Sequence, residues 1–346
     1  MLKEGIVMKN IKFGLAIPTG TEGLMYPIPY SSARDVVELS VFAEKLGFDS
    51  VWGNDHIQTQ EYVLDTFGDN PRYYAPLLVL AAIAERTTTL QLCTALLVVP
   101  FRHPAIMAKE IATLDHLSNG RVLLGAGLGA YREEFESMFG REAKGVIRGE
   151  KLDEGLMLMQ RLFHEDCVSY EGKNFSVKEL RCFPKPVQDP FPFYIGGNSD
   201  HSFGRIAKFG HGWLPAALTT EEIRRGIEKI DACCAQYGRS VKEIDIAPQF
   251  SLMLGDTHEE AVRKFKESQL YKHGMSLSES TMKGKDADNI HTRELVGTAD
   301  EIAGRINDYI EAGVTHFAAI TFADNTLEET REHMQRFAEE VMAKFK

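Results

Sequence analysis

The stretch "GRVLLGAGLGAYREEFESMFG", residues 120–140, runs a short apolar segment directly into three glycines. Gly125, Gly127 and Ala130 fit the dinucleotide-binding pattern G-x-G-x-x-[GA], which is a weak signal by itself. That kind of site also needs an acidic residue at the end of a second strand, ~20 residues further on. Here the position falls in the polar segment "GVIRGEKLDEG". We therefore expect the glycines at the carboxyl end of a barrel strand, where a flat ring can approach the backbone. A sharply turning strand is the alternative.

Short apolar strands alternate with helical patterns along the whole chain, as in a barrel of parallel strands. The expected strands are 12–17, 50–53, 90–99, 121–125, 191–195, 212–214, 244–253 and 315–321. The expected helices are 32–46, 76–86, 104–117, 149–163, 199–209, 220–237, 298–312 and 325–345. The prediction is one α/β domain over residues 1–346, a (β/α)8 TIM barrel. Insertions are expected after strands 4 and 7, at about 166–190 and 258–294, the first with a hairpin near 168–177.

The composition excludes several classes of protein. A net charge of -11, spread along the chain, argues against a nucleic-acid groove. No apolar run approaches the ~20 residues of a membrane span. The five cysteines include no C-x-x-C pair, and the start lacks a secretory signal, so we expect a cytoplasmic protein with reduced thiols. No His, Cys or carboxylate cluster has metal-site spacing, so no metal is expected.

Four stretches resemble motifs of the luciferase-like monooxygenase family, and they occur in the same order as in its members. They are "GFDSVWGNDH" (47–56), the segment 94–140 around the glycines, "FYIGGNSDHSFGRIAKFGHGW" (193–213) and "VGTADEIAGRINDYIEAGVTHF" (296–317). The resemblance implies a TIM barrel that binds reduced FMN or the 5-deazaflavin coenzyme F420 at its C-terminal face. It also implies a homodimer, formed through the helices that begin at Pro76 and Pro104.

His56 and Asp55 follow the second strand and are the catalytic candidates. An imidazole at the carboxyl end of a barrel strand is well placed for proton transfer near neutral pH. The resemblance implies that His56 lies near the reactive edge of the cofactor ring. The alternative is a loop histidine that is simply bonded to Asp55.

Three strand ends are expected to hold the cofactor. The resemblance implies a non-proline cis peptide at Ala95–Leu96 against the ring. Residues 196–199, "GGNS", begin a helix, whose free N–H groups and dipole attract an anion such as a phosphate. Asn198 or Ser199 also suits an N-cap. The full cofactor-binding set is Ala95, Leu96, Gly125, Gly127, Leu128, Gly196, Gly197, Asn198, Ser199 and Ser202.

Leu128 departs from the family's pattern. Some luciferases have an arginine at this position that contacts the phosphate, and some deazaflavin dehydrogenases have a glutamate that acts as an acid. Leu128 therefore weakens the case for a sugar-phosphate dehydrogenase. Nearby, Glu133, Glu134, Arg148 and Glu154 are interpreted as an ion-pair network that fixes a loop.

Large side chains after the first three strands suggest an apolar substrate pocket, although they could equally pack the loops. They are Met25, Tyr26, Tyr73, Tyr74 and Phe101.

The primary hypothesis is a monooxygenase that uses reduced FMN and O2 on a small organic substrate. A flavin reductase or another partner protein would supply the reduced FMN. The alternative is F420-dependent hydride transfer in the same barrel. A non-catalytic flavin-binding barrel is the third possibility. The sequence leaves open the choice between FMN and F420, the use of oxygen and the substrate.

Overall fold

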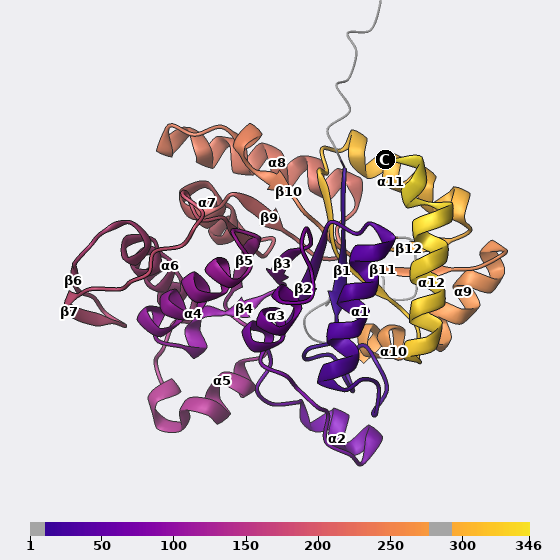
Figure 1. Ribbon diagram of the computed structural model, residues 1–346, viewed down its shortest axis with the longest axis horizontal. Coiled ribbons are helices and arrows are strands. Elements are labelled where there is room, and N and C mark those ends of the chain that lie inside the picture. Colours follow the sequence, from indigo (N-terminus) through magenta and orange to yellow (C-terminus); the bar gives the residue numbers. More distant parts are fainter. Residues whose placement is uncertain (1–10, 277–292) are drawn as a thin grey trace, which may run out of the picture.

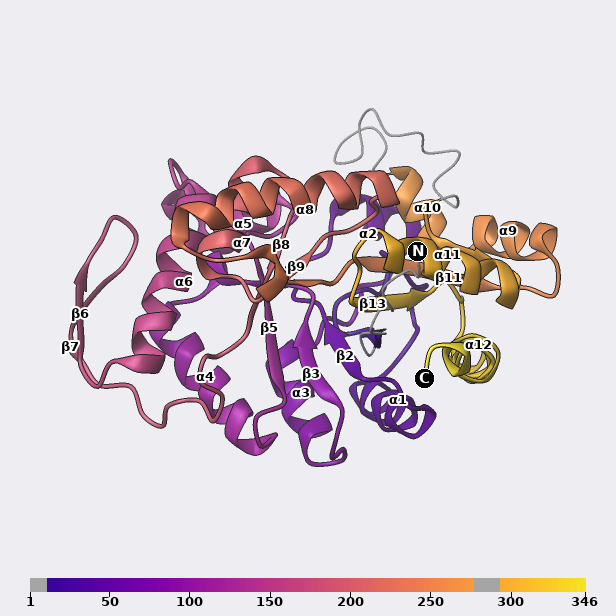
Figure 2. The same cartoon turned by 90° about the horizontal axis from the view of Figure 1, so that it is seen from above.

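Parallel strands form a closed barrel in the computed structural model, which describes residues 11–276 and 293–346 (Figures 1 and 2). Eight strand positions make up the wall in this part of the chain. They are β1 (Lys12–Ile17), β2 (Ser50–Gly53), β3 (Gln91–Thr94), β5 (Val122–Gly127), β8 (Phe193–Gly196), β9 (Gly212–Leu214), β10 (Asp245–Ile246) with β11 (Gln249–Leu254), and β13 (His316–Phe322). The predicted TIM barrel is confirmed.

The seventh strand position closes the barrel. β10 pairs with β9, and β11 pairs with β13, which itself pairs with β1. Between β10 and β11, the Ala247 N–H donates to the carbonyl of Trp213, and the carbonyl of Pro248 accepts from the Ala318 N–H. The sequence predicted one strand over 244–253. Pro248 interrupts it because proline has no N–H to donate to a neighbouring strand.

Eight helices of the described chain cover the outside of the barrel. They are α1 (Ala33–Leu46), α3 (Pro76–Ala84), α4 (Pro104–Leu117), α6 (Arg148–His164), α7 (Asp200–Phe209), α8 (Thr220–Cys234), α11 (Ala299–Glu311) and α12 (Leu327–Glu340). A side chain caps the start of each of them except α3 and α6. α8 begins with a capping box between Thr219 and Glu222, and α1 has one between Ser32 and Asp35. No helix in the described chain combines the length and apolar character needed to cross a membrane.

The predicted insertion at 166–190 holds an antiparallel hairpin, β6 (Val168–Glu171) and β7 (Ser176–Leu180). It follows α6, and the N–H groups of Asn174 and Phe175 donate to Glu154 on that helix. The hairpin therefore packs on the helical layer, and in both views it projects away from the barrel (Figures 1 and 2).

The other long segments contain elements that the sequence did not predict. They are α2 (Glu61–Phe67), α5 (Arg132–Phe139), α9 (His258–Glu267), α10 (Gln269–Ser276) and β12 (Leu295–Gly297). β12 pairs with the end of β11. Of the predicted insertion 258–294, residues 277–292 lie outside the described chain. Figure 1 shows α2, α5 and α10 grouped near the end of the barrel at which the strands finish.

Two strand predictions need correction near that end. The predicted strand 90–99 is broken by a cis peptide bond at Ala95–Leu96, and the short strand β4 (Leu97–Val98) continues beyond it. β5 runs on to Gly127 instead of ending at Gly125. Gly125 and Gly127 therefore lie inside a strand and not in a turn after it.

Candidate active site

His56 and Glu134 form a pair at the carboxyl end of the barrel. His56 follows β2, and its Nδ1 lies 3.2 Å from Oε2 of Glu134 on α5. The side chain of Glu134 is 1% exposed and that of His56 14%. Within the described chain, Nε2 of His56 makes no hydrogen bond. The pair therefore presents Nε2 as a proton acceptor or donor.

Glu134 is held as a carboxylate. Its other oxygen, Oε1, accepts the backbone N–H groups of Ile57 at 2.5 Å and Gln58 at 3.2 Å. Burial raises the pKa of the Glu134 carboxyl, but the hydrogen bonds from His56, Ile57 and Gln58 lower it by more than burial raises it. The pKa therefore lies below its ordinary value. A buried carboxylate on Nδ1 fixes the tautomer of His56 and stabilises the protonated ring.

Two tyrosines flank the imidazole. The ring of Tyr131 stacks on His56 at 5.6 Å between centroids, and the ring of Tyr73 lies at 5.8 Å. Arg148 holds the loop that carries Tyr131, because its guanidinium donates to the carbonyls of Gly129 and Tyr131. Leu128, in the same loop, is 36% exposed. This flank of the site is thus largely apolar.

Asp55 does not bond to its neighbour His56, so the interpretation of His56 as a loop histidine bonded to Asp55 is wrong. Its carboxylate accepts both terminal nitrogens of Arg102, at 2.5 and 2.9 Å, and the N–H of Val98 at 3.0 Å. Asp55 is 2% exposed. It therefore positions β4, just beyond the cis peptide, and its carboxylate makes no hydrogen bond to His56 in the described chain.

The side chain of Leu96 packs against two of the predicted glycines, Gly127 and Gly196. A Cβ added to either Gly127 or Gly196 would lie 2.5 Å from Cδ1 of Leu96. A Cβ on Gly125 would lie 1.8 Å from the carbonyl oxygen of Thr94. The cis peptide stands where the resemblance placed it. However, the glycines make room for Leu96 and for the neighbouring backbone, so they do not by themselves define an open floor for a ring.

The start of α7 resembles an anion cradle. Gly197 has a φ of 107°, and a side chain there would meet Oγ of Ser202 at 2.4 Å. Ser199 caps the helix by accepting the N–H of Ser202 at 3.3 Å. The first-turn acid, Asp200, is bonded to Lys229 at 2.8 Å. Asn198 is exposed, with its amide 3.4 Å from the carbonyl of Ala216.

A small cavity of about 40 Å³ lies in the mouth of the barrel, where β1, β2, β3 and β13 end. Its lining includes Thr21, Asn54, Ala95 and Gln249. The Thr21 hydroxyl is buried and has no hydrogen-bond partner in the described chain. The mouth thus offers an uncommitted hydroxyl beside Ala95, and the helix start at residues 197–199 follows β8, which β5 separates from β3. These features fit a planar cofactor that carries a phosphate.

The proposed substrate residues divide into two groups. Met25 lines the mouth cavity, and Tyr73 lies beside His56. The others pack the loops, as the alternative interpretation stated. Tyr26 is 2% exposed and stacks on Tyr30, Tyr74 donates to the carbonyl of Ser31, and Phe101 packs on Phe135.

The expected ion-pair network after β5 is wrong. Glu134 bonds to His56, Arg148 to backbone carbonyls, and Glu154 to the hairpin. Sequence reasoning therefore missed Glu134 and Thr21 as site residues. Glu134 is 78 positions from His56 in the chain. Its one visible signal is its place shortly after a strand end, because residues there face the mouth of a barrel.

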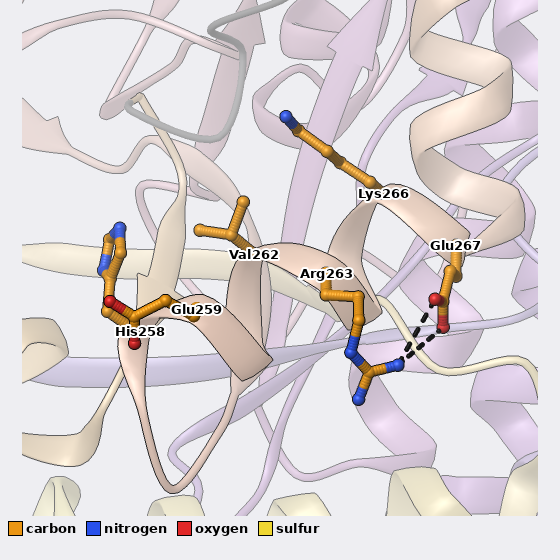
Figure 3. A pocket seen from close by; sticks show the side chains of 6 residues that line it. All are labelled: His258, Glu259, Val262, Arg263, Lys266 and Glu267. Atoms are coloured by element: carbon orange, nitrogen blue, oxygen red, sulfur yellow. Dashed lines mark hydrogen bonds and ion pairs between the residues drawn. The ribbon is translucent and has the colours of Figure 1, made fainter.

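A larger groove, of about 520 Å³, runs along α9 (Figure 3). Side chains of that one helix line it, and it contains none of the predicted site residues. Arg263 and Glu267 within it bond to each other. In the described chain, no group of three or more His, Cys, Asp or Glu side chains is arranged to hold a metal ion.

The fold and the comparisons with known proteins define an oxidoreductase built on a TIM barrel. The chain belongs to the luciferase-like monooxygenase family, whose model matches residues 11–316. It is 28% identical over 332 residues to the F420-dependent glucose-6-phosphate dehydrogenase of Amycolatopsis mediterranei (strain U-32), covering 90% of this chain and 95% of the relative.

Two of the solved structures with this fold serve as examples. The monooxygenase RslO1 from Streptomyces bottropensis superposes with a TM-score of 0.80 at 24% identity, covering 97% of this chain and 100% of that one. The coenzyme F420-dependent tetrahydromethanopterin reductase from Methanopyrus kandleri gives 0.74 at 21% identity, again covering 97% and 100%.

Proposed function

We propose that this protein is an F420-dependent oxidoreductase that transfers hydride between the cofactor and a small uncharged alcohol or carbonyl compound. The relative from Amycolatopsis mediterranei is named as F420-dependent and matches most of this chain. That likeness supports the deazaflavin alternative over the FMN monooxygenase that was the primary hypothesis.

The single observation that carries the proposal is the His56–Glu134 pair. Oxidation of an alcohol needs a base for the O–H proton, and an imidazole supported by a buried carboxylate is such a base. When bound, the oxidised deazaflavin supplies an acceptor for the hydride, which is one proton with two electrons.

In this scheme the alcohol oxygen lies against Nε2 of His56. The O–H proton passes to Nε2, the C–O bond becomes C=O, and the carbinol hydrogen leaves as hydride. Glu134 stabilises the positive charge that forms on the imidazole, and it does so without taking the proton itself. Tyr131 and Tyr73 cover the ring and restrict water around it.

The substrate is proposed to lack a phosphate. Among the described residues near the mouth, three arginines are already engaged: Arg102 by Asp55, Arg72 by Glu22, and Arg148 by loop carbonyls. Arginine and lysine are common partners of a phosphate ester, and the three arginines named here are not available to a substrate phosphate. Leu128 and the aromatic flank of His56 also suit an apolar substituent.

Equilibrium binding of F420 and of FMN to the purified protein, measured by fluorescence, tests the cofactor choice. The expected result is tighter binding of F420 and loss of its visible absorbance on addition of short-chain secondary alcohols. Preferential binding of FMN, with oxygen consumption by the reduced complex, would instead support the monooxygenase. The flavin reductase partner is needed only in that case.

A further inference from the structure

Three polar side chains that line the mouth cavity are not used by the fold itself. They are Thr21, Gln249 and Thr321, and none of their hydroxyl and amide groups makes a hydrogen bond in the described chain. Thr21 is 5% exposed and Thr321 7%. Buried polar groups are normally hydrogen-bonded, because an unmade bond leaves their desolvation uncompensated. A ligand that offers partners to all three groups would therefore gain affinity here.

The three groups lie on one side of the cavity. Thr21 follows β1, Gln249 begins β11 and Thr321 lies in β13, and these three strands are consecutive around the barrel. Trp52 and Ala95 line the same space from the next two strands, β2 and β3. No charged side chain of the described chain lines the cavity. The site therefore suits an uncharged ligand edge that carries several polar atoms.

The size of the cavity limits what can enter it. The volume of about 40 Å³ holds roughly three water-sized groups, at ~10–15 Å³ each. The cavity can thus take the edge of a ring but not a whole ring.

The backbone is fixed at two of the three positions. The N–H of Gln249 donates to the carbonyl of Pro215 at 2.9 Å, and Thr321 is paired with β11. A further amide in the lining, that of Asn54, is already bonded: its Oδ1 accepts the Gly20 N–H and its Nδ2 donates to the Gly20 carbonyl, both at 3.0 Å. Asn54 shows how one primary amide satisfies a neighbouring N–H and C=O. The amide of Gln249 remains available for the same kind of pairing with a ligand.

The two ends of a deazaflavin ring offer different numbers of polar atoms. The pyrimidine end carries a carbonyl, an N–H and a second carbonyl in a row. The other end carries one hydroxyl in F420 and two methyl groups in a flavin. A primary amide presents a donor and an acceptor side by side, so Gln249 can pair with the ring N–H and one carbonyl together, and threonine hydroxyls can donate to the other carbonyl. An amide and two hydroxyls therefore match the pyrimidine edge.

We propose that the amide of Gln249 binds the pyrimidine edge of the cofactor ring in the mouth cavity, where the hydroxyls of Thr21 and Thr321 donate to a ring carbonyl. This inference rests on the proposed function. A ring that lacked the N–H would leave the amide oxygen of Gln249 without a partner, and a site built around a ligand N–H rejects such an analogue for this reason. Because F420 and FMN have the same pyrimidine edge, this cavity does not choose between them.

The test uses two phosphate-free probes, 8-hydroxy-5-deazariboflavin and its N3-methyl derivative, in which a methyl group replaces the hydrogen of the pyrimidine N–H. Their Kd values are measured by fluorescence titration on the full-length protein and on Gln249→Met and Gln91→Met. Methionine keeps the length of glutamine and removes the amide. Gln91 is the matched control, because its amide oxygen also lacks a partner in the described chain, but it begins β3 and so lies at the other end of the barrel. Thermal unfolding confirms that each variant is folded.

Wild type and Gln91→Met are expected to prefer the probe with the N–H by at least about tenfold, through the lost hydrogen bond and the added methyl group. Gln249→Met should bind that probe about tenfold more weakly than the wild type does, while its Kd for the N3-methyl probe changes much less. The same preference in wild type and in folded Gln249→Met would mean that only the size of the methyl group matters, and it would overturn the inference. Equal binding of the two probes by the wild type would overturn it as well.

Failure of this inference and failure of the proposed function give different results. If the wild type binds FMN but neither F420 nor 8-hydroxy-5-deazariboflavin, the proposed function is wrong, and riboflavin with N3-methylriboflavin then tests Gln249 in the same way. If F420 binds and Gln249→Met changes neither Kd, only the role of Gln249 is lost. A wild type that binds F420 but not the phosphate-free probe also counts against the inference, because the ring would then contribute no affinity.

Discussion

His56 and Glu134 lie 78 positions apart in the chain, yet Nδ1 of the one is 3.2 Å from Oε2 of the other. α5, which follows β5, supplies the carboxylate and the end of β2 supplies the imidazole, so the pair joins two segments of the barrel rim on either side of β3. If His56 is the base of the reaction, Glu134 is a positioning residue, because it acts on the substrate through the ring.

We expect His56→Ala to lower kcat about 10²–10⁴-fold while F420 still binds, since the variant removes general-base catalysis. Glu134→Gln should lower kcat less, because the uncharged amide no longer stabilises the positive charge that forms on the imidazole during proton transfer. Steady-state rates of F420 reduction between about pH 5 and 9 measure both effects.

Glu133→Gln is the matched control, because Glu133 is the exposed neighbour of Glu134 on the same helix. It should leave the rate unchanged. If Glu134 were purely structural, the loss of activity in Glu134→Gln would match a loss of folded protein in thermal unfolding, and that outcome would remove its positioning role.

The glycines of β5 are expected to tolerate alanine unequally. At Gly125 the new Cβ would meet the backbone oxygen of Thr94 at 1.8 Å, and backbone cannot easily move away. At Gly127 it would meet Cδ1 of Leu96 at 2.5 Å, the end of a side chain that can rotate. Gly127→Ala should therefore lower the free energy of unfolding by about 1–3 kcal/mol, and Gly125→Ala by more.

Urea unfolding of both variants, and of Gly127→Ala combined with Leu96→Ala, checks this explanation. The double variant should lose less stability than the sum of the two single ones, because the alanine at 127 then fills space that Leu96 has vacated. Additive losses would mean that Leu96 does not occupy that space.

The sequence predicted the barrel well because alternating strands and helices are a local property of the chain. Local signals mark the helix ends: Ser32 and Thr219 are side-chain N-caps, and the glycine after α1 has a left-handed conformation. The His56–Glu134 pair could not be predicted in this way, since no local sequence pattern near either residue indicates contact with the other. Thr21 was missed for a further reason: an unpaired hydroxyl is defined by all of its neighbours in space.

Buried histidines should make the fold sensitive to acid. Burial, with Lys12 nearby, lowers the pKa of His316 from 6.5 to about 3, and burial with His56 nearby lowers that of His273 to about 4. The unfolded chain binds these protons near pH 6.5 and the folded chain does not. Stability from each neutral ring is therefore present above pH 6.5, falls as the pH drops, and is lost below the folded pKa.

His316→Gln tests this sign, because glutamine can keep a bond to Ser50, which lies 2.8 Å from Nε2 of His316. Between about pH 6 and 4 the wild type should lose up to about 1.4 kcal/mol per pH unit more than the variant. Urea unfolding across this range gives both slopes. Equal slopes would mean that His316 is protonated in the folded protein.

The homodimer remains a prediction, with α3 and α4 as its proposed contact. Leu78 is 73% exposed, and Leu117 48%, and both line a groove of about 410 Å³ between these helices. Exposed apolar side chains around a groove are typical of association surfaces. Leu78→Glu should convert the dimer to a monomer in sedimentation velocity, whereas Leu64→Glu on α2 should not. A wild type that sediments only as a monomer at micromolar concentration would rule the dimer out.

The start of α7 should recognise the cofactor phosphate and nothing else of the cofactor. The side chain of Ser199 caps the helix, and the N–H groups that follow face outward from its positive end. Ser199→Ala should therefore weaken binding of F420 by about 1.5–3 kcal/mol, the value of one hydrogen bond to a charged group. Gly197→Ala should weaken it further, because φ is 107° there and Oγ of Ser202 is 2.4 Å from an added Cβ. Neither variant should alter the Kd of 8-hydroxy-5-deazariboflavin, which has the ring but no phosphate. Isothermal titration with both ligands separates the two contributions. Equal weakening of the two ligands would show that the loop at residues 197–199 contacts the ring, and the phosphate would then have to bind elsewhere on the barrel.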